Sequence, residues 1–242
     1  MTKPNLMIVG RGRVGGSLAA AAEAAGIETA QEDGGRAVLL CVPDDAIHDA
    51  CDRLGERTPE LVGHVSGACG LDVLSPASDR GAATFSLHPL QTFPDSQTPT
   101  AGVPCAVSGS SREAVEFAET LAATLGMRPF EVPEEARAEY HAAASIASNF
   151  LIAIEQAAAE LLARAGIEDG RELLSPLVLA TAANWSERGG EALTGPIARG
   201  DTETIARHRD AIGRTWPELL DAYDRLAELT AGVAGAEGVS GR

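Results

Sequence analysis

The start of the chain carries the pattern that most narrows the choice of fold. A short apolar run, LMIV at residues 6–9, leads directly into GRGRVG at residues 10–15, and an alanine-rich segment typical of a helix follows. GRGRVG fits G-x-G-x-x-G, in which the first glycine permits a tight turn, the second lets the backbone approach a diphosphate, and the third lets helix and strand pack closely. The helix N-terminus then offers free N–H groups to the anion. The alternative is a glycine turn without a ligand. We predict a Rossmann-like dinucleotide-binding domain whose diphosphate contacts are Gly10, Gly12, Arg13, Val14 and Gly15.

The connection after this unit is short. Residues 26–30 and 37–42 both read as strands, and only residues 31–36 lie between them. A crossover helix needs about ten residues or more. We therefore expect the second crossover of the Rossmann-like domain to be shortened to a loop.

This short connection bears on the choice of cofactor. The acidic residue that binds an adenosine ribose hydroxyl normally lies about 20 residues past the glycines, and Glu32 or Asp33 there would favour NAD. Arg11, Arg13 or Arg36 would instead meet the extra phosphate of NADP. As an alternative, all of these are solvated loop charges. The sequence predicts an NADP or NAD cofactor without choosing between them.

The rest of the first half alternates strands and helices. Apolar runs at residues 61–65, 82–87, 105–108 and 128–132 read as strands, with helices at 43–53 and 111–125. This order predicts a mainly parallel α/β sheet, which binds ligands at the carboxyl ends of its strands. We expect two strand ends to face the adenosine and nicotinamide parts of the cofactor, through Val42, Pro43 and Asp44 at one and Ser66 and Gly67 at the other.

The second half of the chain is helical. From Glu134 onward apolar residues recur at three- and four-residue spacing, and residues 134–165 could form one helix of about 48 Å. Further helices are expected at 171–185, 202–212 and 216–231. The predicted domains are 1–132, a Rossmann-like α/β domain, and 133–242, an all-α domain for substrate binding and dimerisation.

Composition limits the partners. The 242 residues include 35 acidic and 19 basic side chains, for a net charge of −16, so nucleic acid and anionic membranes would be repelled. No run of about 18 apolar residues occurs, and residues 1–10 read as a core strand rather than a signal peptide. The four cysteines show no metal-binding spacing, so no metal is expected. We expect a cytoplasmic protein with a small-molecule substrate.

Three segments hold candidate catalytic residues. His88 follows a strand and would donate to a substrate oxygen, or else bond to the neighbouring backbone. His141, Ser145 and Asn149 are spaced by four residues, which places them along one slowly turning helix face. Arg199, in the loop at residues 192–201, would bind a carboxylate in bidentate fashion or, alternatively, pair with Asp201. Buried polar groups of this kind need hydrogen-bond partners, which a substrate or cofactor would supply.

Four motifs carry a resemblance to a known family. SGA at residues 66–68, HPLQTF at 88–93, YHAAASIASN at 140–149 and ALTGPIARGD at 192–201 resemble the Rossmann-like family with a helical C-terminal domain of unknown function. The resemblance implies a relation to the 6-phosphogluconate dehydrogenase, 3-hydroxyisobutyrate dehydrogenase, ketopantoate reductase and prephenate dehydrogenase group. It implies a nucleotide domain, an all-α domain, a cleft between them, and NAD(P)-dependent hydride transfer.

The chain departs from that group at one important position. The β-hydroxyacid dehydrogenases carry Lys-x-x-x-Asn on a helix, with the lysine protonating the substrate oxygen. Aligning their asparagine with Asn149 puts Ser145 in place of the lysine, and Lys3 is too far away in the fold to replace it. Another acid must serve, and His141 or His88 is the natural candidate because histidine titrates near neutral pH.

These observations lead to one main hypothesis and two rivals. The chain is expected to be an NAD(P)-dependent oxidoreductase of a small carbonyl or hydroxy acid, with an activity similar to that of ketopantoate reductase. His141 would be acid and base, Asn149 would orient the substrate and Arg199 would bind its carboxylate. One rival is a prephenate-dehydrogenase-like enzyme that uses His88. The other is a nucleotide-binding sensor or scaffold without catalysis. The long helix and its small residues also predict a homodimer.

Overall fold

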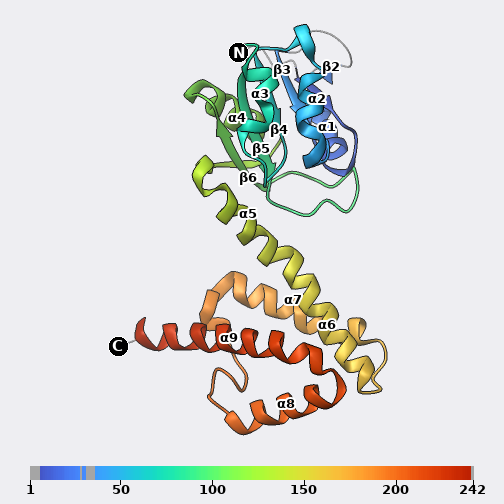
Figure 1. Ribbon diagram of the computed structural model, residues 1–242, viewed down its shortest axis with the longest axis vertical. Coiled ribbons are helices and arrows are strands. Elements are labelled where there is room, and N and C mark those ends of the chain that lie inside the picture. Colours follow the sequence, from blue (N-terminus) through green and yellow to red (C-terminus); the bar gives the residue numbers. More distant parts are fainter. Residues whose placement is uncertain (1–5, 28, 31–35, 241–242) are drawn as a thin grey trace. The chain divides into compact units, whose positions relative to one another are not determined.

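The computed structural model describes residues 6–27, 29, 30 and 36–240 and divides into two compact units, Met1–Ser148 and Asn149–Arg242. Figure 1 shows an α/β unit followed by a helical one. The predicted domain boundary after residue 132 lies where the last strand has ended, whereas the division into compact units falls inside the helical segment that follows. Each unit is described by itself below.

The first unit is built on a seven-stranded sheet in the order β2-β1-β3-β4-β5-β6-β7. All neighbouring strands are parallel except β5 and β6, which are antiparallel. The predicted fold class is therefore confirmed. The predicted short connection, with Glu32 and Asp33, lies between β2 and β3, and only Arg36 of it falls within the described residues. The strands are β1 (Leu6–Val9), β2 (Thr29–Ala30), β3 (Ala37–Leu40), β4 (Leu61–His64), β5 (Ala83–Pro89), β6 (Pro104–Gly109) and β7 (Arg128–Glu131).

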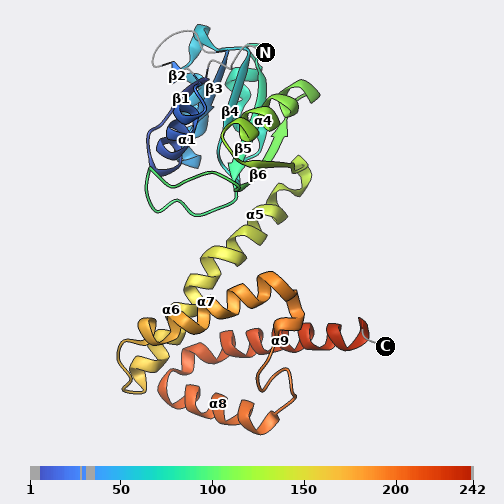
Figure 2. The same cartoon turned by 180° about the vertical axis from the view of Figure 1, so that it is seen from behind.

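Helices cover both faces of this sheet (Figures 1 and 2). On one face α1 (Arg13–Ala24) and α4 (Arg112–Thr124) pack against the strands through a continuous apolar core that includes Leu18, Phe85 and Leu121. On the other face α2 (Ile47–Asp52) and α3 (Ser75–Ser78) bury a second apolar cluster against β3 and β4. Burial on both faces explains why β3 is apolar at every position, as parallel strands in such folds usually are.

The second face of the sheet is apolar over β3 and β4 but carries polar side chains over β5 and β6. In β5, Phe85 and Leu87 belong to the core beneath α1 and α4, while the alternate residues Ser86 and His88 point to the opposite side. Ser86 lies directly opposite Ser108 of the antiparallel β6. Polar side chains at buried strand positions need partners, and here these come from the helix that follows β7.

That helix was predicted as one element and contains several parts. A 3₁₀ turn at Glu134–Ala136 leads into α5 (Arg137–Ser145), a π-helical segment at Ile146–Phe150 and α6 (Leu151–Arg164). The run Glu134–Arg164 is helical throughout, as expected. It is also, among the described residues, the one helix long and apolar enough to cross a membrane by length and composition alone, a weak criterion that core helices of soluble proteins also meet.

The second unit continues with three further helices. They are α7 (Gly170–Arg188), α8 (Thr202–Thr215) and α9 (Leu220–Ser240). The first two contain the predicted helices within longer bounds, whereas α9 begins four residues after the predicted start and continues to Ser240. Asp201 caps α8 by accepting a hydrogen bond from the Thr204 N–H. The predicted all-α second half is confirmed.

His64 at the end of β4 shapes the turn that follows it. Its side chain is fully buried, its Nε2 lies 3.1 Å from the Gly70 carbonyl oxygen, and its Nδ1 accepts a hydrogen bond from the Ser66 N–H at 3.2 Å. An imidazole with this pattern is neutral, with the proton on Nε2. Burial lowers its pKa to about 4. His64 thus holds residues 65–70 in place across the carboxyl edge of the sheet.

The burial of His64 predicts a loss of stability in acid. Its pKa is about 6.5 in the unfolded chain and about 4 when folded, so between these values only the unfolded state binds the proton. His64 alone should lower the free energy of unfolding by about 3 kcal/mol as the pH is lowered from 6.5 to 4, and its contribution should not change further below pH 4. Denaturant unfolding followed by circular dichroism at several pH values measures this.

The matched comparison uses two histidine variants. His64→Gln keeps an N–H donor for Gly70 and should make the acid slope shallower, while His48→Gln, at an exposed position of α2, should leave it unchanged. An equally steep slope in His64→Gln and in the unchanged protein would contradict the assignment.

Candidate functional site

The glycine turn between β1 and α1 is formed as the sequence predicted. Gly10 has a φ of +94°, and a Cβ there would lie 2.4 Å from the Cys41 carbonyl oxygen. A Cβ on Gly15 would lie 2.1 Å from the Gly10 carbonyl oxygen. Both positions therefore exclude any larger residue for reasons of backbone packing.

Gly12 differs from these two glycines. A Cβ there would meet no atom within 4 Å, and its φ of −67° is open to any residue. Gly12 is also the N-cap of α1, where no side chain caps the helix and the first turn carries no acidic residue. Neither packing nor backbone conformation requires glycine at this position. A diphosphate seated against the free N–H groups would require it, so these residues fit the predicted ligand.

The other predicted cofactor contacts lie at the same edge of the sheet. Val42 follows β3, and its Cγ1 would be 3.3 Å from a Cβ on Gly10; Pro43 and Asp44 come next, and Asp44 opens a short 3₁₀ turn. Ser66 and Gly67 follow β4. The Ser66 N–H is used by His64, and the Ser66 hydroxyl accepts hydrogen bonds from the N–H groups of Ala68 and Cys69.

The proline-containing loop after β5 reaches back to the glycine turn. The Ser17 hydroxyl of α1 donates to the Asp95 carbonyl oxygen at 3.4 Å, and a Cβ on Gly16 would lie 2.6 Å from the Cβ of Ser96. The loop is held by Asp95, whose carboxylate accepts the Gln97 N–H at 2.8 Å. It therefore runs along the carboxyl edge of the sheet from β5 to α1.

His88 sits at this edge and has a partner that the sequence did not suggest. Its Nδ1 lies 2.6 Å from the Tyr140 hydroxyl oxygen, and the two rings meet edge to face. A Cβ on Gly67 would lie 2.7 Å from the His88 ring, so the imidazole rests directly on the turn after β4. The alternative prediction was a histidine bonded to neighbouring backbone. In the structure His88 instead pairs with Tyr140 and lies against Gly67, a predicted nicotinamide contact.

Burial sets the protonation of this pair. It lowers the pKa of His88 to about 4, with repulsion from His141 and Arg137 acting in the same direction. Burial also raises the pKa of Tyr140 to about 12. Between these values the pair is neutral and keeps one transferable proton on the imidazole and one on the phenol.

A buried polar cluster lies next to the His88–Tyr140 pair, two residues earlier in β5. Arg137 is only 5% exposed, and its guanidinium donates to the Ser86 hydroxyl at 2.8 Å and to the Ser108 hydroxyl at 2.6 Å, and also to the Glu134 carboxylate. Ser108 donates to the same carboxylate at 2.5 Å. The other carboxylate oxygen of Glu134 accepts the Leu71 N–H at 3.0 Å. The cluster ties the start of α5 to β5, to β6 and to the turn after β4.

The charges in this cluster compensate each other. Burial acts to raise the pKa of Glu134, but the hydrogen bonds from Arg137 and Ser108 outweigh it and lower the pKa. Arg137 Nε is the one buried side-chain nitrogen or oxygen atom in the described part of the chain that has no hydrogen-bond partner. A buried guanidinium is tolerated only when it is paired in this way.

The remaining predicted catalytic residues fall in different units. His88 and His141 belong to the first unit, Asn149 and Arg199 to the second. His141 is half-buried on α5, whereas Asn149 and Arg199 are exposed. The expected stripe through His141, Ser145 and Asn149 is interrupted, because Asn149 lies in the π-helical segment, where the spacing of five residues per hydrogen bond shifts the helix face.

Sequence reasoning missed Arg137, Tyr140, Glu134, Ser86 and Ser108. The usable signal was the alternation in β5, where Thr84, Ser86 and His88 form a polar face in an otherwise buried strand. A polar face on a covered strand implies a polar partner. Among the described residues no group of three or more His, Cys, Asp or Glu side chains is arranged to hold a metal ion.

Comparison with solved structures shows what this fold is similar to. A protein from Thermotoga maritima is 23% identical, with a TM-score of 0.78 over 96% of this chain and 99% of that one. A candidate NADP oxidoreductase from Bacteroides fragilis is 22% identical, with a TM-score of 0.76 over 95% and 98%. A Streptomyces aurantiacus imine reductase is 14% identical, with a TM-score of 0.65 over 95% and 98%. No curated protein matches the chain.

Family comparison covers both halves of the chain. A Rossmann-like domain matches residues 27–89, and a domain of unknown function, DUF2520, matches residues 103–230. The second match includes β6, α4, β7 and most of the helical unit, which is more than half of the chain. The protein therefore belongs to the DUF2520 family.

Proposed function

We propose that this protein is an NAD(P)-dependent oxidoreductase that transfers a hydride between its cofactor and a small carbonyl or hydroxy-acid substrate. The observation that carries the proposal is the neutral His88–Tyr140 pair, which lies on the same sheet edge as the open glycine turn. The names of two proteins with this fold, an NADP oxidoreductase and an imine reductase, support the same class of reaction.

The chain would hold the cofactor through its backbone. The uncapped N-terminus of α1, with Gly12 as its open approach, binds the diphosphate, and the exposed side chain of Arg13 adds positive charge. Val42, Pro43 and Asp44 line the adenosine side, and Gly67 with Ser66 lines the nicotinamide side. The choice between NADP and NAD stays open. When bound, the reduced cofactor supplies a hydride; the chain supplies binding, orientation and a proton.

The His88–Tyr140 pair is suited to handle that proton. In one arrangement the Tyr140 hydroxyl donates to His88 Nδ1 and the Nε2–H donates to the substrate; in the other, Nδ1–H donates to Tyr140, whose hydroxyl faces the substrate. In either case the hydride goes to the carbonyl carbon, the proton goes to the carbonyl oxygen, and solvent restores the proton. Oxidation of a hydroxyl group uses the same steps in reverse.

The finer assignment follows the residues' chemistry. We propose a ketopantoate-reductase-like reaction, with Asn149 orienting the substrate and Arg199 binding its carboxylate. The second candidate is a prephenate-dehydrogenase-like enzyme, the reaction for which the sequence suggested His88 rather than His141. We propose His88 as the proton donor in either reaction. The hydrogen-bonded pair favours His88. A prephenate dehydrogenase from A. aeolicus, solved with NAD+, shares the fold at 14% identity.

The third candidate is a nucleotide-binding sensor or scaffold without turnover. We further propose a small-molecule substrate, no nucleic acid or membrane partner, and a cytoplasmic location.

The glycine turn allows binding to be separated from folding. Gly12→Ala should weaken the binding of NADPH or NADH at least about tenfold, because the new methyl group occupies the approach to the diphosphate. Its melting temperature should stay unchanged, since the Cβ meets no atom. Gly15→Ala is the contrasting variant, because its Cβ would overlap the Gly10 carbonyl oxygen and lower the melting temperature. Calorimetry and thermal melting measure the two effects.

The result that would overturn the cofactor assignment is simple. If the unchanged protein gave no heat of binding with either NADPH or NADH, the oxidoreductase proposal would fail. If Gly12→Ala and the unchanged protein bound NADPH or NADH with equal affinity, the nucleotide would have to bind at another place than this turn.

Histidine variants separate the candidate acids. His88→Gln or Tyr140→Phe should reduce kcat about 100-fold or more while cofactor affinity is kept, as expected for loss of a group acting in proton transfer. His141→Gln is the matched comparison and should cause the smaller loss. A screen of 2-oxo acids and imines with the better-bound coenzyme provides the substrate for these measurements.

The pH profile gives an independent reading. Because the pair is neutral between about pH 4 and pH 12, kcat/KM should show no inflection near pH 6.5. A rate that falls as the pH rises through 6.5 would point to an imidazolium acid instead of this pair. Tight cofactor binding without turnover on any substrate would support the sensor.

A further inference from the structure

We propose that the loop between β5 and β6, residues 90–103, forms a second wall of the dinucleotide site, and that Ser96 and Gln97 at its tip (residues 94–97) bind the diphosphate of the cofactor. The inference rests on the proposed function and adds to it binding residues outside the glycine turn. It follows from the path of the loop, from the residue against which its tip packs, and from the side chains that the tip carries.

The loop runs along the same edge of the sheet as the predicted cofactor. It begins after Pro89 of β5 and reaches α1, where the Asp95 carbonyl oxygen accepts the Ser17 hydroxyl. In the sheet, β4 and β3 lie between β5 and β1, the strand that leads into α1, and Figures 1 and 2 show the loop as a long green connection extending from β5 toward α1. A dinucleotide bound to a doubly wound sheet lies outside these same carboxyl ends, at the point where the strand order reverses, which is here between β1 and β3.

Gly16 explains how the tip comes so close to α1. It lies inside the helix, after the last glycine of the G-x-G-x-x-G pattern, and its N–H donates to the Gly12 carbonyl oxygen at 2.8 Å. Glycine destabilises a helix interior relative to alanine, so its presence here needs a reason. A Cβ on Gly16 would lie 2.6 Å from the Ser96 Cβ and 3.0 Å from the Ser96 carbonyl oxygen. Close packing of the tip on the first turn of α1 is that reason.

This contact lies beside the predicted diphosphate position. Gly16 follows the N-cap Gly12 by four residues, which is about 6 Å along the helix axis. The N–H groups that a diphosphate can use belong to the residues between them, because the N–H of Gly16 already donates to Gly12. A diphosphate with a ribose on each side spans more than this distance. A tip that rests on Gly16 therefore borders the bound cofactor.

The tip carries uncharged hydrogen-bond donors. Ser96 and Gln97 are both exposed. The one charged group of the tip, the Asp95 carboxylate, is bound within the loop, where it accepts the Gln97 N–H at 2.8 Å and the Thr98 hydroxyl at 3.1 Å. A hydroxyl and a carboxamide donate to phosphate oxygens without adding charge. The exposed side chain of Arg13 on the glycine turn supplies positive charge to the same group.

The base of the loop is fixed more firmly than its tip. Thr100 is buried and its hydroxyl donates to the Leu125 carbonyl oxygen at 2.7 Å, while the Gln91 side-chain amide donates to the Pro99 carbonyl oxygen at 3.0 Å. In the described part of the chain, the 3.4 Å bond from Ser17 is the one hydrogen bond that joins the tip to another element. The tip is thus held in position beside α1 and keeps its side chains available to a ligand.

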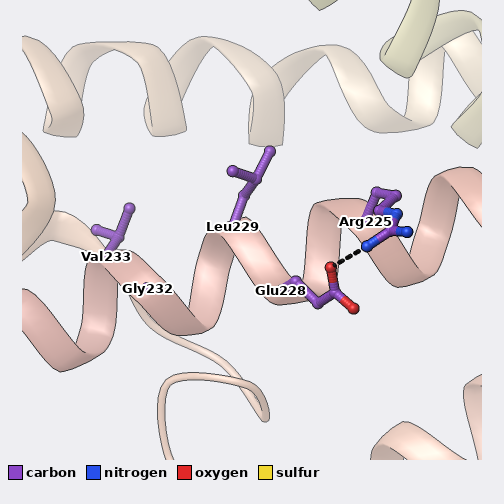
Figure 3. A pocket seen from close by; sticks show the side chains of 5 residues that line it. All are labelled: Arg225, Glu228, Leu229, Gly232 and Val233. Carbon is purple, nitrogen blue, oxygen red and sulfur yellow. Dashed lines mark hydrogen bonds and ion pairs between the residues drawn. The ribbon is translucent and has the colours of Figure 1, made fainter.

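Two helix glycines provide a matched test of the docking contact. Gly16→Ala should raise the dissociation constant of the better-bound coenzyme at least about tenfold, because the new methyl group displaces Ser96 and the tip with it. Gly232→Ala is the control, since a Cβ there would meet no atom within 4 Å, and Figure 3 shows Gly232 on α9 beside Val233. It should leave the affinity unchanged. Calorimetry with NADPH and NADH measures both.

A double-mutant cycle tests the role of the tip itself. Ser96→Ala keeps the Cβ that packs on α1 and removes only the hydroxyl, so it should raise the dissociation constant about fivefold without changing the melting temperature. In the Gly16→Ala background the same change should have little further effect, because the displaced tip no longer reaches the cofactor. Losses that simply add would show that Gly16→Ala acts without moving Ser96, contrary to the proposal.

Hydrogen–deuterium exchange gives a second measurement that does not depend on turnover. A saturating concentration of coenzyme should slow exchange at residues 92–98 of the unchanged protein, because the tip gains a partner. At equal occupancy, the coenzyme should protect this segment much less in Gly16→Ala.

The outcomes separate this inference from the proposed function. If the unchanged protein binds neither coenzyme, the proposed function fails and this inference fails with it. If it binds one of them, but Gly16→Ala and Ser96→Ala bind it equally well and the tip gains no protection, the loop is not part of the site and the cofactor assignment stands. If Gly16→Ala does not fold, Ser96→Ala and the exchange measurement on the unchanged protein decide.

Discussion

The candidate site depends on the burial of one arginine. Arg137 carries a full charge into the face of the sheet, and a charge there is stable only if its hydrogen bonds are formed together. Ser86, Ser108 and Glu134 form them, and each comes from a different element. The first turn of α5 is therefore held in one register over β5 and β6. One turn farther on, the same helix places Tyr140 against His88. The proton chemistry we propose thus depends on a structural ion pair beside it.

Local order was predictable from the sequence, and the long-range contacts were not. The glycine turn is specified by residues within one strand–turn–helix unit, so its pattern is readable without knowing the rest of the chain. The succession of strands and helices along the chain follows from the apolar runs in the same way, whereas the order of the strands within the sheet was not predicted. Arg137 and Tyr140 reach partners that lie 51 and 52 residues away in sequence. Spacing along one helix cannot reveal such a contact, although the polar alternation in β5 indicated that something polar had to cover it.

The interrupted stripe on the long helix shows a second limit. The prediction for His141, Ser145 and Asn149 assumed one hydrogen-bond spacing from end to end, and a π-helical segment at Ile146–Phe150 breaks that assumption. Its sequence, IASNF, carries no proline or glycine that would mark it. Such segments often occur at functional positions, because they redirect side chains without ending the helix. The division between the two compact units falls within this one.

The two units differ in how much apolar surface they bury, and the candidate functional residues are divided between them. The first unit buries apolar side chains on both faces of its sheet, so the glycine turn and the His88–Tyr140 pair stand on a complete fold. Over residues 149–235, the second unit buries only Gly170 and Ile212. Asn149 and Arg199 belong to this unit. If they act on substrate, changes that disturb the packing of the helical unit should weaken substrate binding and leave cofactor binding intact, because the glycine turn belongs to the other unit.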